Sequence, residues 1–132
     1  MTSNALSLLG LALRGNNLAV GEEPVKEACR TRRARLVMSA ADAAQNSIDR
    51  AGRMAELGGV PWVRIPWDKE ALGSALGRNT CAVAALTDRG LAAAFAEKLV
   101  RTDGGLRPCL ESLLKDKKKS RAETKKPAVP ET

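Results

Sequence analysis

Residues 18–42 read LAVGEEPVKEACRTRRARLVMSAAD, and this stretch decides the fold. It begins with three apolar residues, passes through Gly21 into a segment with helical spacing, and ends in the short apolar run Leu36–Ala40. A short, uniformly apolar run between polar segments is typical of a strand that is buried on both faces. The stretch therefore predicts a short extended piece over Leu18–Val20, a helix and a strand, with the helix running to about Arg32 and Pro24 tolerated in its first turn.

The sequence on both sides continues this alternation. Before this stretch, a helix is expected over Asn4–Arg14, stopped by Gly15. After it, we expect a helix that Asp42 caps and that runs to about Leu57, ending at Gly58-Gly59, and then a strand over Val60–Pro66. A helix capped by Asp68 and closed after Leu76 by Gly77, a strand over Cys81–Leu86, and a helix from Asp88 to about Arg101 complete the series. Because the strands are too apolar to face water on one side, we expect an α/β fold in which the sheet lies between helical layers.

The residue composition of the chain changes at Thr102. Gly104-Gly105 has the character of a hinge, residues 106–114 of a loose helix, and residues 115–132 are charged and contain proline. Such a segment cannot bury enough apolar area to fold alone. We therefore expect one domain over residues 1–101 and a basic, largely disordered tail over residues 102–132. This tail either is simply solvated or adds a flexible, sequence-independent contact with RNA. The basic residues that would make such a contact are Lys115, Lys117, Lys118, Lys119, Arg121, Lys125 and Lys126.

Composition points to a polyanionic partner. The chain has 132 residues, is 44% hydrophobic and carries a formal net charge of +7, with a pI near 9.8. This length suffices for one core and is too short for two ordinary domains. A basic chain of this size is typical of a protein that binds nucleic acid, although a net charge of this size also serves solubility.

Several classes of function are disfavoured. The chain has no histidine, and its three cysteines are dispersed, without the spacing of a metal or redox site. It lacks a phosphate-binding loop, a dinucleotide fingerprint and a nucleophile elbow, and helix capping explains the aspartates that precede helices. We expect no enzyme activity, no cofactor and no metal. With neither a signal segment nor a membrane-spanning run, a cytoplasmic protein is expected.

The start of the helix after Gly21 is the first candidate binding element. Glu22, Glu23 and Lys26 lie in its first turns, beside backbone N–H groups that have no partner within the helix. One interpretation is structural: Gly21 caps the helix, the acids suit its positive end, and Glu22 pairs with Lys26 at i,i+4. The other is that this turn enters an RNA groove, where the carboxylates accept hydrogen bonds from bases and Lys26 meets acceptor edges or phosphate.

The other end of this helix is rich in arginine. Arg30, Arg32, Arg33 and Arg35 fall within six residues. Arginines at a helix C-terminus compensate its negative end, but four exceed what that requires. Contact with RNA phosphates is therefore the preferred interpretation.

Three segments of the chain resemble the 7Ae/30e-type ribosomal proteins, whose members bind kink-turn RNA, and more closely their bacterial YlxQ-like branch. The segments are Leu18–Lys26, Ala34–Asp42, and Val60-Pro61 followed by Lys69–Gly77 and the strand Cys81–Asp88. Their order and spacing make the combination specific, and the resemblance extends over about residues 4–101. The resemblance implies a three-layer α/β/α sandwich with a mostly four-stranded mixed sheet. It also implies recognition of an RNA whose sharp bend displays sheared G·A pairs.

By position in the family, Gly21, Glu22, Glu23 and Lys26 match the base-reading turn. The loop that packs on an extruded nucleotide corresponds to Gly77, Arg78, Asn79, Thr80, Cys81, Ala82 and Val83. The chain departs from the strong kink-turn binders at Glu22, where they usually have Asn. Asparagine can donate a hydrogen bond to guanine acceptors, whereas glutamate cannot. The expected ligand is therefore a kink-turn, a variant bend or a site in ribosomal RNA.

The resulting hypothesis is a monomeric protein that binds structured RNA without catalysis, with the ribosome as a further candidate partner. A protein–protein adaptor on the same fold is the alternative. A third hypothesis, the RNA-recognition part of a modifying enzyme, is disfavoured because the chain lacks a cofactor motif.

Overall fold

The computed structural model describes residues 3–102 and Leu110, over which helices and strands alternate as predicted. In chain order the elements are α1 (Ser3–Arg14), β1 (Leu18–Val20), α2 (Glu22–Arg30), β2 (Leu36–Ser39), α3 (Gln45–Gly58), β3 (Trp62–Arg64), α4 (Lys69–Ala75), β4 (Val83–Leu86) and α5 (Arg89–Thr102). The predicted hinge, tail and loose helix lie outside the described residues, except for Leu110. That side chain is fully buried in the larger core cluster.

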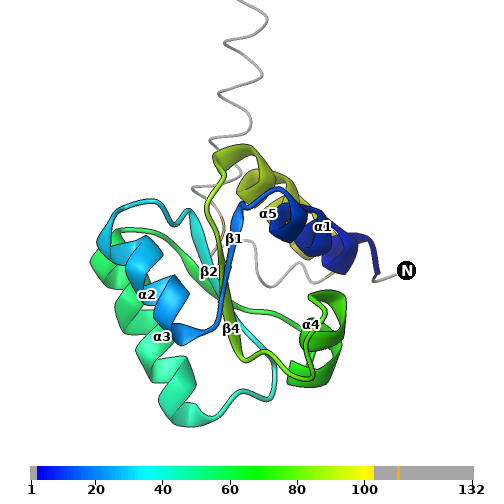
Figure 1. Cartoon of the computed structure of the whole chain (residues 1–132), viewed down its shortest axis with the longest axis horizontal. Coiled ribbons are helices and arrows are strands. Elements are labelled where there is room, and N and C mark those ends of the chain that lie inside the picture. Colours follow the sequence, from blue (N-terminus) through cyan, green and yellow to red (C-terminus); the bar gives the residue numbers. More distant parts are fainter. Residues whose placement is uncertain (1–2, 103–109, 111–132) are drawn as a thin grey trace, which may run out of the picture.

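The four strands form one mixed sheet in the order β1-β4-β2-β3 (Figure 1). β4 lies antiparallel to both of its neighbours, and β2 is parallel to β3. The register pairs Val20 with Ala84 and Ser39 with Val83. The turn that follows β1 and the loop that precedes β4 therefore meet at the same end of the paired strands.

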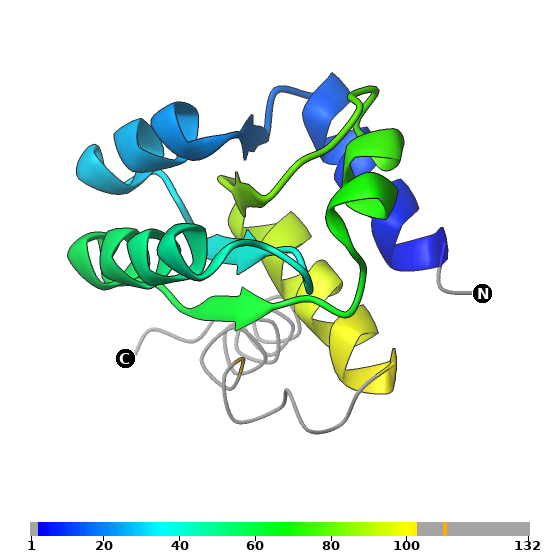
Figure 2. The ribbon, with the colours of Figure 1, turned by 90° about the horizontal axis from the view of Figure 1, so that it is seen from below.

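Helices cover both faces of the sheet, with α2 and α3 on one face and α1, α4 and α5 on the other (Figures 1 and 2). Successive side chains of β2 point to opposite faces. Leu36 and Met38 join the larger cluster with Phe95, whereas Val37 joins the smaller cluster under α2 and α3. This arrangement confirms the predicted three-layer α/β/α sandwich with a four-stranded mixed sheet.

Two of the three predicted helix caps are confirmed. Asp68 Oδ1 accepts a hydrogen bond from the Ala71 N–H at 2.8 Å, in the first turn of α4. Asp88 Oδ2 accepts one from the Leu91 N–H at 2.9 Å, in the first turn of α5. Gly59 ends α3 in the left-handed region with φ 68°, which is the stop predicted for this helix.

The prediction that Asp42 caps α3 is wrong. Helix α3 begins after Ala44 without a side-chain cap, and Asp42 Oδ1 accepts its hydrogen bond from the Lys69 N–H of α4 at 2.8 Å. The cause is the parallel pairing of β2 with β3, because the segments that leave two parallel neighbours run side by side. The hydrogen bond from the Ala41 N–H to the Trp67 carbonyl joins these two segments at 2.8 Å.

Strands β3 and β4 are shorter than their predicted apolar runs by two residues or more. Proline cannot donate to a sheet, so β3 is confined between Pro61 and Pro66. The Cys81 N–H bonds to the Lys69 carbonyl at 3.0 Å instead of joining the ladder, and β4 begins two residues later.

Candidate nucleic-acid interface

The turn before α2 is built around Gly21. Its φ of 95° and ψ of 164° lie in a region that L side chains rarely adopt. Its N–H donates to the Val83 carbonyl of β4 at 3.0 Å, and its carbonyl accepts from the Val25 N–H at 3.1 Å. Gly21 thus joins the start of α2 to β4, one of the two central strands of the sheet.

Glu22 is held by α3. Its carboxylate accepts hydrogen bonds from Arg50 Nε at 2.8 Å, Arg50 Nη2 at 2.9 Å and Ser47 Oγ at 3.2 Å. The hydrogen bonds from Arg50 lower the pKa of Glu22 against the opposing effect of burial. The Glu22–Lys26 pair expected in the structural interpretation does not form, because Glu22 turns to the neighbouring helix.

Glu23 and Lys26 are exposed, and neither has an ion-pair or hydrogen-bond partner among residues 3–102. With Glu22, they face a hollow of about 200 Å³ between α2 and α3. The α3 side chains that complete its lining are Arg50, Arg53 and Met54. Sequence reasoning missed the two arginines, because nothing in the local pattern of α3 indicates which face meets α2.

The loop 77–83 is seated on α4 by a close approach of two backbones. A Cβ atom at Gly73 would lie only 2.6 Å from Thr80 Cα, so only glycine fits there without movement. Arg78, Asn79 and Thr80 are exposed, whereas Cys81 and Val83 are buried. The predicted loop therefore offers only part of its length to a ligand.

Cys81 lies beneath this loop. Its Sγ donates to the Val83 carbonyl at 3.3 Å, and burial raises the pKa of its thiol. Burial also raises the pKa of Cys29, which packs under Gly58 between α2 and α3. Both thiols are buried and act as small apolar groups of the core.

The α2 turn and the loop 77–83 form one surface, called here the recognition surface. The hydrogen bond between Gly21 and Val83 ties them together, and a Cβ at Gly21 would lie 4.0 Å from Arg78 Nη1. This juxtaposition follows from the antiparallel pairing of β1 with β4. The structure thus places together two predicted elements that are far apart in the sequence. The members of this surface that were predicted as site residues and remain at least partly accessible are Gly21, Glu22, Glu23, Lys26, Gly77, Arg78, Asn79, Thr80 and Ala82.

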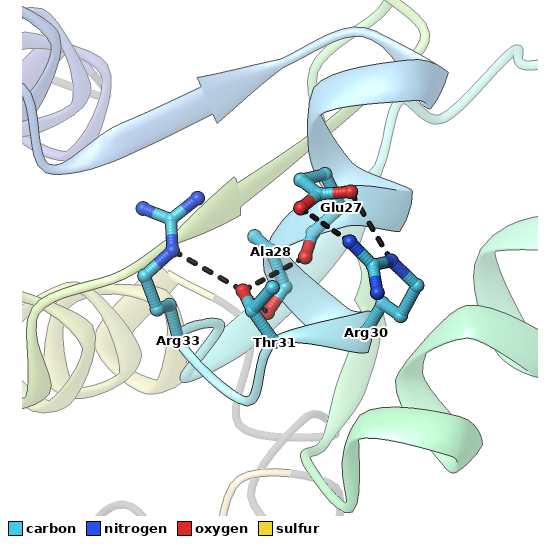
Figure 3. Close-up of polar contacts among 5 residues, drawn as sticks. All are labelled: Glu27, Ala28, Arg30, Thr31 and Arg33. Carbon is cyan, nitrogen blue, oxygen red and sulfur yellow. Dashed lines mark hydrogen bonds and ion pairs between the residues drawn. The ribbon is translucent and has the colours of Figure 1, made fainter.

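The arginine cluster, residues 30–35, lies at the other end of α2. Nine helical residues separate the two ends by about 12 Å. Arg30 forms two hydrogen bonds with Glu27 at 3.2 and 2.7 Å, and Arg33 Nε donates to Thr31 Oγ1 at 3.2 Å (Figure 3). Figure 3 shows Arg30 and Arg33 extending to opposite sides of the chain. The cluster therefore presents separate cations, and Arg35 is half-buried.

Arg32 adopts a conformation that normally belongs to glycine. Its φ is 64°, and its N–H bonds to the Cys29 carbonyl while the Arg33 N–H bonds to the Ala28 carbonyl. These two bonds form a Schellman motif, whose left-handed residue is usually glycine. This conformation also ends α2 at Arg30, two residues before the predicted end.

Metal-ligand clusters and membrane-spanning helices are both absent from the part of the chain that the structure describes. Residues 3–102 and 110 contain no group of three or more metal-ligating side chains close enough to hold an ion. In the same residues, the helices are too short or too polar to cross a membrane.

Comparisons with known proteins agree with this architecture. The sequence pattern of the ribosomal protein L7Ae/L30e/S12e/Gadd45 family matches residues 3–95. The RNA-binding protein YlxQ of Bacillus subtilis (strain 168) is 33% identical over 93 residues, which are 70% of this chain and 88% of that protein.

Two solved structures are similar. A Bacillus halodurans protein of unknown function superposes with a TM-score of 0.66 and 28% identity, over 72% of this chain and 95% of that one. The Giardia lamblia 15.5kD RNA binding protein superposes with a TM-score of 0.59 and 26% identity, over 78% of this chain and 88% of that one. The family pattern covers most of the sequence, and the fold is shared with these relatives. The chain therefore belongs to the ribosomal protein L7Ae/L30e/S12e/Gadd45 family.

Proposed function

We propose that this protein binds structured RNA with a sharp, kink-turn-like bend and acts without catalysis in ribosome-associated particles. The observation that carries the proposal is the recognition surface, on which the α2 turn and the loop 77–83 are joined by the hydrogen bond between Gly21 and Val83. Two similar proteins are described as RNA-binding, which supports RNA as the ligand.

The side chains of the α2 turn suit the edges of bases. Lys26 supplies N–H donors to base or phosphate oxygens, and Glu23 accepts from base amino and imino groups. Neither has a partner within residues 3–102, so no internal contact must be broken before RNA binds. The exposed part of the loop, with Arg78, Asn79 and Thr80, would cover a base that leaves the stack.

The arginine cluster suits the phosphate backbone, because separated guanidinium groups follow a charged backbone without reading its sequence. Arg32 supports this role. A left-handed conformation costs a non-glycine residue about 1–2 kcal/mol, and the residue that adopts it here is a cation. Backbone strain of this kind is a recognised pointer to function.

The test is binding to a kink-turn duplex and to a straight duplex of equal length, across a salt series. A preference for the bent RNA that persists as salt rises is the expected result, because shape and base contacts are less sensitive to salt than phosphate contacts. Equal binding that collapses as salt rises would overturn bend recognition. If no RNA binds and protein partners survive nuclease treatment, the adaptor alternative is correct.

Lys26→Ala tests the base-reading role. It is expected to weaken binding to the bent RNA by about 1–3 kcal/mol, with a much smaller effect on the straight duplex. Arg101→Ala is the matched control, since Arg101 is an exposed cation on the opposite face of the sheet. An equal loss on both RNAs would show that Lys26 contributes charge alone.

A further inference from the structure

We infer that the hollow between α2 and α3 is a phosphate-binding extension of the recognition surface. In this inference, Arg50 and Arg53 contact the RNA backbone, and Glu22 is a positioning residue that orients Arg50. The inference rests on the proposed RNA function and adds a second helix to it. It also assigns Glu22 a role other than base reading.

The contacts of Glu22 are the first support. Both of its oxygens already accept hydrogen bonds, from two nitrogens of Arg50 and from Ser47 Oγ. A base that used Glu22 as an acceptor would have to compete with a charged, forked donor. Forked pairs between arginine and carboxylate are among the strong hydrogen bonds of proteins.

The remaining donors of Arg50 are the second support. A guanidinium carries five N–H groups. Glu22 takes two of them, on Nε and Nη2, and Arg50 forms no other hydrogen bond with the described residues. Three N–H groups of a half-exposed side chain are thus available. Since the carboxylate fixes one edge of the planar group, the orientation of the other edge is set before a ligand arrives.

Arg53 lies one turn further along α3. Residues at i and i+3 lie on the same side of a helix, and both arginines line the hollow with Lys26. Arg53 is exposed and has no ion-pair or hydrogen-bond partner in residues 3–102. Three cations therefore face two carboxylates around the hollow, and once Arg50 is paired with Glu22, Lys26 and Arg53 face Glu23 alone. This imbalance favours an anionic ligand, and the adjoining recognition surface makes it the backbone of the same RNA.

The experiment measures affinity for a kink-turn duplex against salt for wild type, Arg50→Ala, Arg53→Ala and Arg101→Ala. Each substitution in the hollow is expected to weaken binding several-fold and to reduce the salt slope by about 1, as for one lost phosphate contact. Arg101→Ala is expected to change neither quantity. Arg53 has no partner in the described residues, so its replacement tests the surface without disturbing the fold.

A double-mutant cycle assigns the role of Glu22. If Glu22 positions Arg50, Glu22→Ala lowers affinity in the wild type. In the Arg50→Ala background it raises affinity, because it removes an unpaired negative charge near phosphate. A loss in both backgrounds would make Glu22 a direct base reader and overturn its positioning role.

Unchanged salt slopes in both Arg50→Ala and Arg53→Ala would overturn the phosphate site while leaving bend recognition intact. The proposed function fails separately, through the loss of preference for the bent RNA in the wild type.

Discussion

The two ends of α2 are held by different kinds of contact. At the N-terminal end, Gly21 bonds to Val83 and Glu22 to Arg50, and both partners come from distant parts of the chain. At the C-terminal end, the side-chain contacts join Glu27 to Arg30 and Thr31 to Arg33, within four positions of each other. The polar contacts of one end thus come from distant elements, whereas the polar side chains of the other end contact only their neighbours in sequence.

This difference matches two kinds of RNA contact. Base reading requires donors and acceptors held to within about 0.5 Å, which needs rigid support from neighbouring elements. Phosphate contact tolerates long, mobile cations and carries no sequence information. The N-terminal end of α2 has the support that the first task requires, and the arginine cluster has the chemistry that the second requires.

The largest effect is expected from Gly73→Ala, which breaks the support of the N-terminal end. The added Cβ would lie under 3.0 Å from three backbone atoms of Thr80, so the loop 77–83 must move. Overpacking of this kind costs about 1–3 kcal/mol of unfolding free energy. We expect that loss in urea unfolding, together with loss of the preference for bent over straight RNA.

Gly52→Ala is the matched control, because a Cβ at Gly52 meets nothing within 4 Å. Alanine is favoured over glycine inside a helix, so this variant is expected to be slightly more stable and to bind RNA normally. If Gly73→Ala keeps its selectivity for bent RNA, the loop 77–83 has no part in recognition.

Gly21→Ala disturbs the N-terminal end of α2 through its backbone conformation. Its φ of 95° is strained for any L side chain, at a cost of order 1–3 kcal/mol. Relaxing that strain moves the N–H that bonds to Val83, and we expect a lowered thermal midpoint with weaker binding to bent RNA. Full selectivity in a destabilised variant would show that the turn contributes to stability alone.

Arg32→Gly separates stability from binding at the C-terminal end. Glycine suits the left-handed position of the Schellman motif, so unfolding free energy is expected to rise by up to about 1 kcal/mol. Loss of the cation is expected to weaken binding to bent and straight RNA by the same factor. Opposite changes in stability and affinity would support a functional arginine, whereas unchanged affinity would leave it without an RNA role.

The smallest effect is expected from the acid response of Glu22→Gln. Because Arg50 lowers the pKa of Glu22, the stabilisation by this pair is present above the ordinary pKa of 4.5 and is lost as pH falls through the lowered value. Wild type is therefore expected to exceed Glu22→Gln in stability near neutral pH, and the difference narrows in acid. The effect is small since both groups are partly exposed. The control is Glu23→Gln, which removes an exposed carboxylate without an ion pair. If the difference in stability from wild type narrowed equally in acid for both variants, the role of Arg50 would be contradicted.

The sequence was most informative where a local pattern determines structure. Apolar runs placed β2, β3 and β4, and the short extended piece predicted over Leu18–Val20 is β1. Asp68 and Asp88 cap helices that start where their positions indicated. The strand predicted from hydropathy ran over Val60–Pro66, whereas β3 spans only Trp62–Arg64. The cause of this shortening is also local, because Pro61 and Pro66 flank the strand. Local signals failed at Asp42, which follows β2. Its carboxylate accepts a hydrogen bond from the Lys69 N–H at the start of α4, the helix that follows β3.

The candidate site followed the same division. The residues of the α2 turn were identified from the sequence, but the partner of Glu22 was not, since Arg50 is 28 positions away. Gly73 carried no recognisable signal, because its importance comes from the Thr80 backbone packed against it. Such features depend on tertiary packing, which a single sequence does not specify locally.

The hydrogen bond from Gly21 to Val83 also makes the proposed recognition sensitive to opening of the sheet. An RNA that holds the α2 turn and the loop 77–83 together cannot remain fully bound while β1 separates from β4. By linkage, bound RNA then raises the free energy of that opening, by about 2.7 kcal/mol when free RNA is 100-fold above Kd. The amide of Gly21 therefore reports on binding, because its exchange with solvent deuterium would slow as the bent RNA saturates the protein.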